Sequence, residues 1–201
     1  VEGRKHLVEL DGAGLAVDGE VVLGSAGNAG EIGHIVVDPD GPECGCGARG
    51  CVAVTCTPES LVREAWSVID GPAPGEAADT ARVDAAFTRL ADVAERGEPR
   101  AVEVLDRAAV RFARLLSVIT NLLDVDRVVL GGPFWSRLDA RLMTVLPGEI
   151  DRLRAARGIH PIAIEGSRLG DDVAAIGAAA VILDRSLSPR TKSLLLPAFS
   201  A

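Results

Sequence analysis

The chain has 201 residues, of which 48% are hydrophobic, and a formal net charge of −8. This length and composition support a substantial core in one large domain or two small ones. The negative charge argues against a broad nucleic-acid-binding face, and an aromatic content of 3% argues against a base-stacking platform. No apolar run reaches the length of a membrane span and no signal-peptide pattern opens the chain, so we expect a cytoplasmic protein without a membrane partner.

The first part of the chain consists of short apolar, β-branched runs separated by glycines. Three runs are expected to be strands: 5–10, 14–17 and 20–23. Asp18-Gly19 between the last two is typical of a hairpin turn. Gly12 and Gly14 permit a turn.

The stretch from Gly24 to Cys51, GSAGNAGEIGHIVVDPDGPECGCGARGC, carries the strongest chemical signal. It contains four soft or borderline metal ligands: His34, Cys44, Cys46 and Cys51. Zn²⁺ takes such ligands in a tetrahedron, and a Cys₃His set leaves no open position, so the sequence predicts a structural zinc site. The alternative is a cluster of free or disulfide-bonded cysteines. Ile35-Val36-Val37, within this stretch, is expected to form a short strand.

Cys56 is expected to be a buried small hydrophobe. Beyond it the apolar residues follow a helical period. Thr55 or Thr57 can cap a helix that begins at Pro58 and reaches about Ile69. Two longer helices are expected after a Gly- and Pro-rich break, over 79–96 and 99–123.

Three arginines lie off the apolar stripe of the longest predicted helix: Arg107, Arg111 and Arg114. We expect them to be solvated, with an anion site as the alternative.

The last third alternates strand and helix. The expected elements are a short apolar strand that stops at Gly131-Gly132, a mostly helical segment over 134–157 disturbed near Pro147-Gly148, a strand over 161–164, and a helix from Val173 to about Asp184. Gly131-Gly132 ends the first of these strands and permits a turn. The Ala-rich face of the last helix is expected to pack on the sheet. Strands that alternate with helices after an initial hairpin predict an α/β domain with a mixed sheet.

The string GNAGEIGH followed by CGCGARGC resembles the signature of the ROK family, which groups bacterial sugar kinases with sugar-responsive repressors. The resemblance implies that His34, Cys44, Cys46 and Cys51 bind one zinc ion and that Glu31 and His34 lie against a sugar. It also implies an actin-like ATPase (ribonuclease H-like) lobe flanked by helices. Residues 1–186 would be the C-terminal sugar- or effector-binding lobe with its zinc knuckle at 34–51, and 187–201 an extended tail.

The nucleotide side of the resemblance is weaker. Gly12 and Gly14 align with the end of the family's phosphate-facing hairpin, and Gly131-Gly132 with its adenosine-side turn. However, Glu9 places a carboxylate where the triphosphate of ATP would sit, which argues against nucleotide binding. Ala53 stands where the family often has a sugar-binding glutamate, and each sugar hydroxyl left unpaired costs about 1–3 kcal/mol.

The favoured function is therefore the effector-sensing and oligomerising part of a ROK transcriptional regulator. It would bind a small sugar or sugar phosphate as a homodimer or tetramer and contact DNA only through a region absent from this chain. The sequence has no Asn-Asp dipeptide that could supply the catalytic base of the family kinases, so this chain alone is not expected to phosphorylate a sugar. The alternatives are a fragment or divergent form of an ATP-dependent ROK sugar kinase, and a zinc-stabilised assembly module without a ligand.

Overall fold

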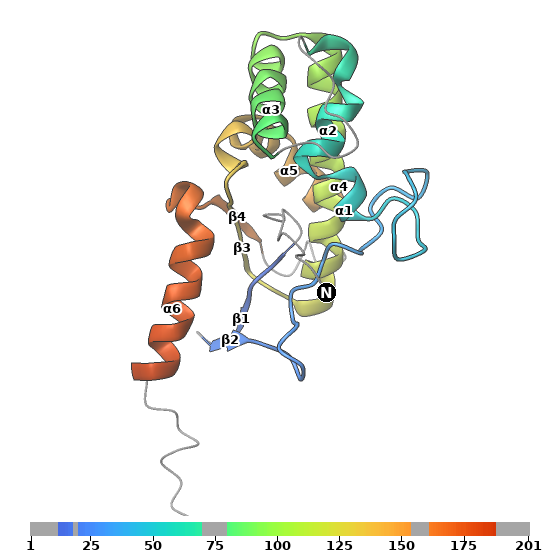
Figure 1. The fold of residues 1–201 in the computed structure, drawn as a ribbon. Helices are drawn as coiled ribbons and strands as arrows, with labels where there is room; N and C mark the ends of the chain where they lie inside the picture. Colours follow the sequence, from blue (N-terminus) through green and yellow to red (C-terminus); the bar gives the residue numbers. More distant parts are fainter. Residues whose placement is uncertain (1–11, 18–19, 70–79, 154–160, 188–201) are drawn as a thin grey trace, which may run out of the picture.

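The computed structural model describes residues 12–17, 20–69, 80–153 and 161–187 (Figure 1). The helices are α1 (Val52–Thr55), α2 (Pro58–Glu64), α3 (Thr80–Glu95), α4 (Pro99–Leu123), α5 (Asp139–Leu153) and α6 (Val173–Leu187). Short 3₁₀ helices are η1 (Trp66–Val68), η2 (Trp135–Arg137) and η3 (Gly170–Asp172). The strands are β1 (Leu15–Val17), β2 (Glu20–Val22), β3 (Arg127–Leu130) and β4 (Ala163–Gly166).

The four strands form two separate pairs among the described residues. β1 and β2 pair antiparallel with Leu15 opposite Val22, as the predicted hairpin requires. β3 and β4 pair parallel, with Arg127 opposite Ala163. Helices lie between β2 and β3 and between β3 and β4, in keeping with the α/β class. The described strands do not, however, join into the single mixed sheet that was expected. The expected strand over 5–10 and the Asp18-Gly19 turn lie outside the described residues.

The predicted strand at Ile35–Val37 is reduced to a single bridge between Val36 and Cys51. The amides of Val37 and Asp38 both donate to the carbonyl of Gly50, at 2.9 and 3.1 Å. Because this shared acceptor turns the backbone, a regular ladder cannot continue. The segment is therefore a loop rather than a strand.

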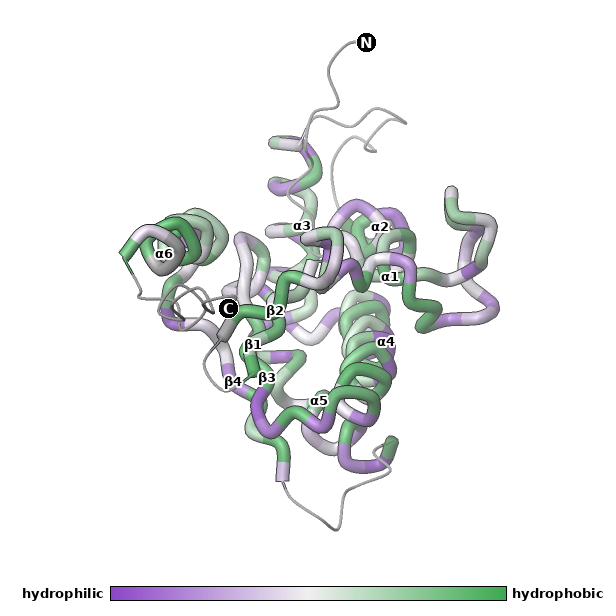
Figure 2. Tube along the Cα trace, turned by 90° about the horizontal axis from the view of Figure 1, so that it is seen from below, coloured by the Kyte–Doolittle hydropathy of each residue, from purple (hydrophilic) through white to green (hydrophobic). Residues whose placement is uncertain are grey.

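α4 is the central helix, and it confirms the predicted bounds of 99–123. Glu98 caps its first turn by accepting from the amide of Ala101 at 2.6 Å, and Asp124 ends it in a left-handed conformation. Figure 2 shows long hydrophobic stretches on α4 and the neighbouring α5. The largest buried side chains of the core come mostly from α2, α3, α4 and α5 and include Leu61, Phe87, Leu90, Leu105, Leu142, Leu146 and Ile150. Burial of these apolar side chains, each contributing about 1.5–3 kcal/mol, is the main source of stability.

Two expected helices have different bounds in the structure. The helix that begins at Pro58 is capped by Thr57 as predicted, but it ends at Glu64 and continues as the 3₁₀ turn η1. α5 runs from Asp139 to Leu153 as one helix, without the disturbance expected near Pro147. Leu142, Leu146 and Ile150 are buried at helical spacing, and this packing holds the helix on the core despite the proline.

α6 contradicts the expectation that its Ala-rich face packs on the sheet. Residues 174–180 are all exposed, and Ile182 is 65% exposed. Figure 1 shows α6 standing apart from the other helices. Alanine side chains offer little apolar area, so composition alone did not determine where this helix lies. The helix ends at Leu187, and the remainder of the expected tail lies outside the described residues.

Candidate metal centre

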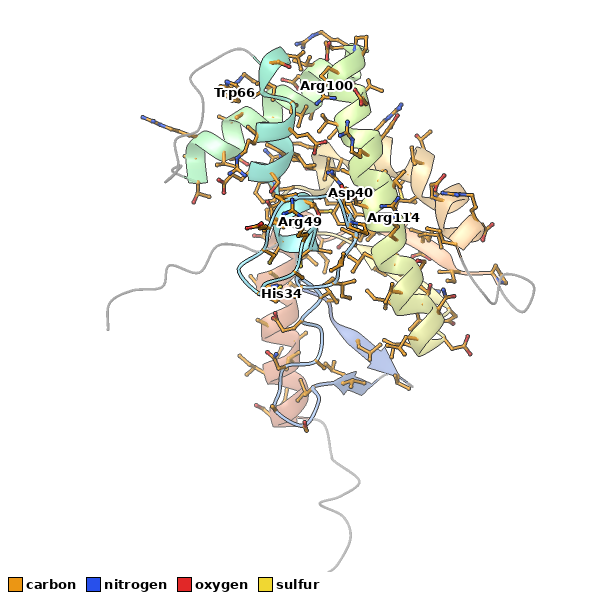
Figure 3. All side chains as sticks on the ribbon, turned by 90° about the vertical axis from the view of Figure 1, so that its right-hand side faces the viewer. His34, Asp40, Arg49, Trp66, Arg100 and Arg114 are labelled. Carbon is orange, nitrogen blue, oxygen red and sulfur yellow. The ribbon has the colours of Figure 1, made fainter. Side chains whose placement is uncertain are left out.

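The four predicted metal ligands come together in the loop over 34–51, which we call the metal loop. The ligand atoms of His34, Cys44, Cys46 and Cys51 all lie within 4.8 Å of one another. Cys44 Sγ lies 3.5 Å from His34 Nδ1, and Cys46 Sγ lies 3.7 Å from Cys51 Sγ. Figure 3 shows the loop with His34 at one end and Arg49 near the other.

Two of these distances match the edges of a zinc tetrahedron. Zn–S bonds of about 2.3 Å and a Zn–N bond of about 2.0–2.1 Å give tetrahedral edges of about 3.8 Å between sulfurs and about 3.5 Å between sulfur and nitrogen. The Cys46–Cys51 pair and the His34–Cys44 pair are within 0.1 Å of these values, at 3.7 and 3.5 Å. All the separations lie within 4.8 Å, so the four donors complete a tetrahedron if the longer separations contract by up to about 1 Å.

A compact backbone fold creates this arrangement. The amide of Cys44 donates to the carbonyl of Ala48 and the amide of Gly50 to that of Pro42, each at 2.8 Å. Gly50 has a φ of 67°, and a Cβ added there would lie 1.5 Å from the carbonyl oxygen of Asp38. Only glycine permits this close crossing, which brings Cys51 back toward Cys44 and Cys46.

The cysteines differ strongly in their surroundings. Cys46 is exposed, and hydrogen bonds from the Ala48 backbone and then from the Cys44 and Cys51 side chains lower its pKa to about 7. Cys51 is fully buried, and this burial raises its pKa to about 12. Cys46 thus provides a thiolate near neutral pH, whereas Cys51 must lose its proton when a metal binds.

Cys56 has no place in this cluster. It is 1% exposed, as expected for a small hydrophobe, and burial raises its pKa to about 11.

Of the two predicted sugar residues, His34 belongs to the cluster and Glu31 precedes it by three residues. His34 presents Nδ1 to Cys44, so Nε2 remains available to a ligand. Glu31 is exposed three residues earlier and pairs with Gly12 through an isolated bridge. Ala53, in α1, lies next to the segment that carries Glu31 and His34, because its amide donates to the carbonyl of Gly33 at 2.9 Å.

Three of the four predicted nucleotide glycines line one cavity of about 820 Å³. Gly12 and Gly14 reach it beside β1, and Gly131 reaches it at the end of β3. A Cβ at Gly131 would lie 2.8 Å from Cβ of Ser167, so packing between the ends of β3 and β4 already accounts for this glycine. Gly132, with a φ of 119°, completes the turn that follows. Gly12 and Gly14 have no described atom within 4 Å of an added Cβ, so packing among the described residues does not require glycine there.

Three arginines of α4 were predicted to be solvated, and this expectation is wrong for Arg111, which is buried. Arg111 is only 6% exposed and forms ion pairs with Asp38 of the metal loop and Glu64 of α2. Arg107 pairs with Glu64 and Glu103, and Arg114, although exposed, donates to the carbonyl of Val37 at 2.8 Å. Apart from Glu103, which lies one helical turn before Arg107, the partners are distant in sequence, so the helical pattern carried no signal for these contacts.

Comparison with known proteins decides the family. Residues 11–185 match the family model described as the ROK family. This chain belongs to the ROK family. The ROK resemblance read from GNAGEIGH and CGCGARGC is thereby confirmed.

Relatives include both enzymes and a regulator. The chain is 29% identical over 172 residues to an N-acetylmannosamine kinase of Yersinia pestis (strain Pestoides F), covering 84% of this chain and 52% of that protein. A ROK hexokinase from Thermus thermophilus matches with 26% identity and a TM-score of 0.67, over 87% of this chain and 55% of that one. A ROK glucokinase from Streptomyces griseus, solved with glucose and AMPPNP, matches with 25% identity and a TM-score of 0.67, over 85% and 56%.

A ROK transcriptional regulator homologous to the E. coli MLC protein matches with the same TM-score of 0.67 and 24% identity, over 85% of this chain and 42% of that one. This likeness shows the fold, which is the actin-like fold expected from the sequence. The chain spans about half the length of the curated relatives that it matches. Among the described residues, no helix is both long and apolar enough to cross a bilayer.

Proposed function

We propose that this chain is the sugar-binding lobe of a ROK protein and that a zinc ion at the metal loop holds its sugar-contacting residues in place. The observation that carries the proposal is the ligand geometry, in which four donor atoms lie within 4.8 Å of one another. Zinc bound by His34, Cys44, Cys46 and Cys51 would supply a structural crosslink, because a Cys₃His set leaves no position for a reacting water.

The chain's own residues would recognise the sugar. His34 Nε2 would hydrogen-bond one hydroxyl while Nδ1 faces the metal cluster. Glu31, exposed on the same segment, would accept hydrogen bonds from further hydroxyls. Ala53 offers no acceptor at its position, which favours a ligand with one fewer hydroxyl to satisfy on that side.

We further propose that this lobe senses its sugar rather than phosphorylating it, as part of a transcriptional regulator. Ala53 and Glu9 support this function, since the first removes a sugar contact and the second opposes a triphosphate. Such a regulator would assemble as a homodimer or tetramer and would contact DNA through a region outside this chain.

Sugar phosphorylation is the second candidate, and one observation favours it. The bridge between Gly12 and Glu31, with the amide of Ala13 donating to the carbonyl of Gly30 at 2.9 Å, joins the glycine segment to the sugar segment. A kinase needs this juxtaposition, because the γ-phosphate must adjoin the sugar hydroxyl that attacks it.

Calorimetric titration of the full-length protein with glucose and with N-acetylmannosamine tests the proposal, followed by an assay for phosphorylated sugar with Mg-ATP. We expect binding of one of these sugars that Glu31→Gln weakens by about tenfold or more. Glu59→Gln, a half-buried carboxylate of α2, is the control and should bind as the wild type does.

The outcomes separate the candidates. Sugar binding without product supports sensing, whereas phosphorylated sugar supports the kinase. Zinc without binding of any tested sugar would favour the assembly module and contradict the proposal.

A further inference from the structure

Arg111 is a buried cation in the middle of α4 with partners on three other segments. Its Nε and Nη2 both donate to Oδ2 of Asp38, at 3.0 and 2.7 Å. Its Nη1 donates to Oε2 of Glu64 at 2.9 Å and to the carbonyl of Thr55 at 3.2 Å. Burial alone would lower the pKa of Arg111, but the hydrogen bonds to Glu64 and Asp38 outweigh it and raise the pKa, so the guanidinium stays charged.

Two short paths lead from this guanidinium to the metal ligand Cys51. Along the first, the amide of Asp38 donates to the carbonyl of Gly50, the residue before Cys51. Along the second, Thr55 receives the hydrogen bond of Arg111 on its carbonyl and donates its own hydroxyl to the carbonyl of Cys51 at 2.8 Å. The position of Cys51 is therefore fixed from both sides by groups that Arg111 holds.

Arg114 provides a second contact one helical turn further along α4. Its Nη1 donates to the carbonyl of Val37, the residue before Asp38, at 2.8 Å. Figure 3 shows Arg114 on α4, beside the loop that carries His34, Asp40 and Arg49. The central helix thus holds consecutive residues of the metal loop, one by its side chain and one by its backbone.

We propose that Arg111 is a positioning residue for the metal site: it holds the metal loop on α4 in the geometry that the ion requires. A loop whose ligands are already placed loses little conformational entropy when a metal binds, and a bound metal leaves it slowly. The inference rests on the proposed zinc site and adds to it the residue that couples this site to the helical core. An arginine that served stability alone would leave the release of zinc unchanged.

The experiment compares two carboxylates that each receive a hydrogen-bonded arginine. Asp38→Asn weakens the contact to Arg111 while preserving side-chain volume and leaves Arg111 paired with Glu64. The matched control is Asp106→Asn, because Asp106 of α4 receives two hydrogen bonds from Arg141 of α5, away from the metal loop. Zinc release from each purified, folded protein is measured at pH 7.5 with a chromogenic chelator in excess.

We expect zinc to leave the Asp38→Asn variant about tenfold faster than the wild type, as is common when an outer-shell partner is lost. Asp106→Asn should release zinc at the wild-type rate. Equal release rates for all three proteins would overturn the proposal.

A wild-type protein that binds no zinc would also overturn it, and would place the failure in the zinc site itself rather than in Arg111. If Asp38→Asn does not fold, Arg111→Lys serves the same comparison, since lysine keeps the charge but cannot reproduce the planar set of donors. We expect this variant, too, to release zinc about tenfold faster.

Discussion

Cys46 and Cys51 contribute the same kind of sulfur atom to the cluster from opposite environments. The pKa of exposed Cys46 is lowered to about 7, so it is mostly thiolate at pH 8 and mostly thiol at pH 6. Because zinc binds the thiolate, below about pH 7 it must also displace the Cys46 proton. We predict that zinc affinity falls more steeply below pH 7 than above it, by about a further tenfold per pH unit. Chelator competition at pH 6, 7 and 8 measures this, and a constant slope across the range would contradict it.

Replacement of Cys46 by serine should abolish stoichiometric zinc binding. A hydroxyl stays protonated at neutral pH and is a poor zinc ligand, so three donors would remain. We expect less than about one tenth of the wild-type metal content by elemental analysis, with a lower melting temperature. Cys56→Ala is the control: it removes a buried thiol outside the cluster, so it should cost about 1–2 kcal/mol of stability but retain one zinc per chain. Loss of zinc in both variants would argue against the assigned ligand set.

Two glycines of the metal loop should respond differently to alanine. Gly50→Ala places a methyl group against the carbonyl of Asp38 and forces an unfavourable φ, so we expect a loss of about 3 kcal/mol or more together with the zinc. Gly45→Ala meets no described atom within 4 Å and should change stability by less than about 1 kcal/mol. Chemical denaturation of both variants measures the difference. Similar stabilities would show that the loop does not cross itself at Gly50.

At the scale of single elements, capping residues and apolar periodicity predicted where helices form better than composition predicted strands or the packing partners of a helix. Thr57 before Pro58 marked the start of α2, and a long apolar period marked α4, because caps and periodicity are local properties. Ile35–Val37 had the composition of a strand but became a loop, because Gly50 supplies one carbonyl to two amides. The Ala-rich α6 formed at the predicted place and yet remained exposed, since composition does not specify a packing partner.

The N-cap of α4 offers a test of an element that is independent of the metal. The carboxylate of Glu98 accepts from the amide of Ala101 at 2.6 Å, where the helix dipole also favours negative charge. We predict that Glu98→Ala costs about 1 kcal/mol, or roughly 2–4 °C in melting temperature, with unchanged zinc content. Glu98→Gln keeps an acceptor and should cost about half as much. An Ala variant as stable as the wild type would contradict the cap.

Across the whole molecule, the four residues of the candidate metal cluster could be identified from sequence, but the residues that hold their loop in place could not. His34, Cys44, Cys46 and Cys51 lie in one short motif whose chemistry is evident from residue type alone. Arg111 contacts Asp38 and Glu64 across 73 and 47 residues of sequence, and no local pattern reports such a distance. The motif therefore predicts the set of donor residues, whereas the fold determines how rigidly these residues are held.

Removal of zinc should loosen the metal loop without dissolving the helical core. The core is built largely by α2, α3, α4 and α5, and the metal loop contributes Val37 to it. A ligand present at 100 times its dissociation constant stabilises the native state by about 2.7 kcal/mol. At roughly 2–4 °C per kcal/mol, we predict that EDTA lowers the melting temperature by about 5–10 °C while far-UV circular dichroism at 20 °C stays nearly unchanged. Added zinc, but not magnesium, should restore the melting temperature, because a thiolate-rich tetrahedral set excludes a hard octahedral ion. A melting temperature insensitive to EDTA would contradict a zinc contribution to stability, and loss of helical signal on chelation would show that the core depends on the metal.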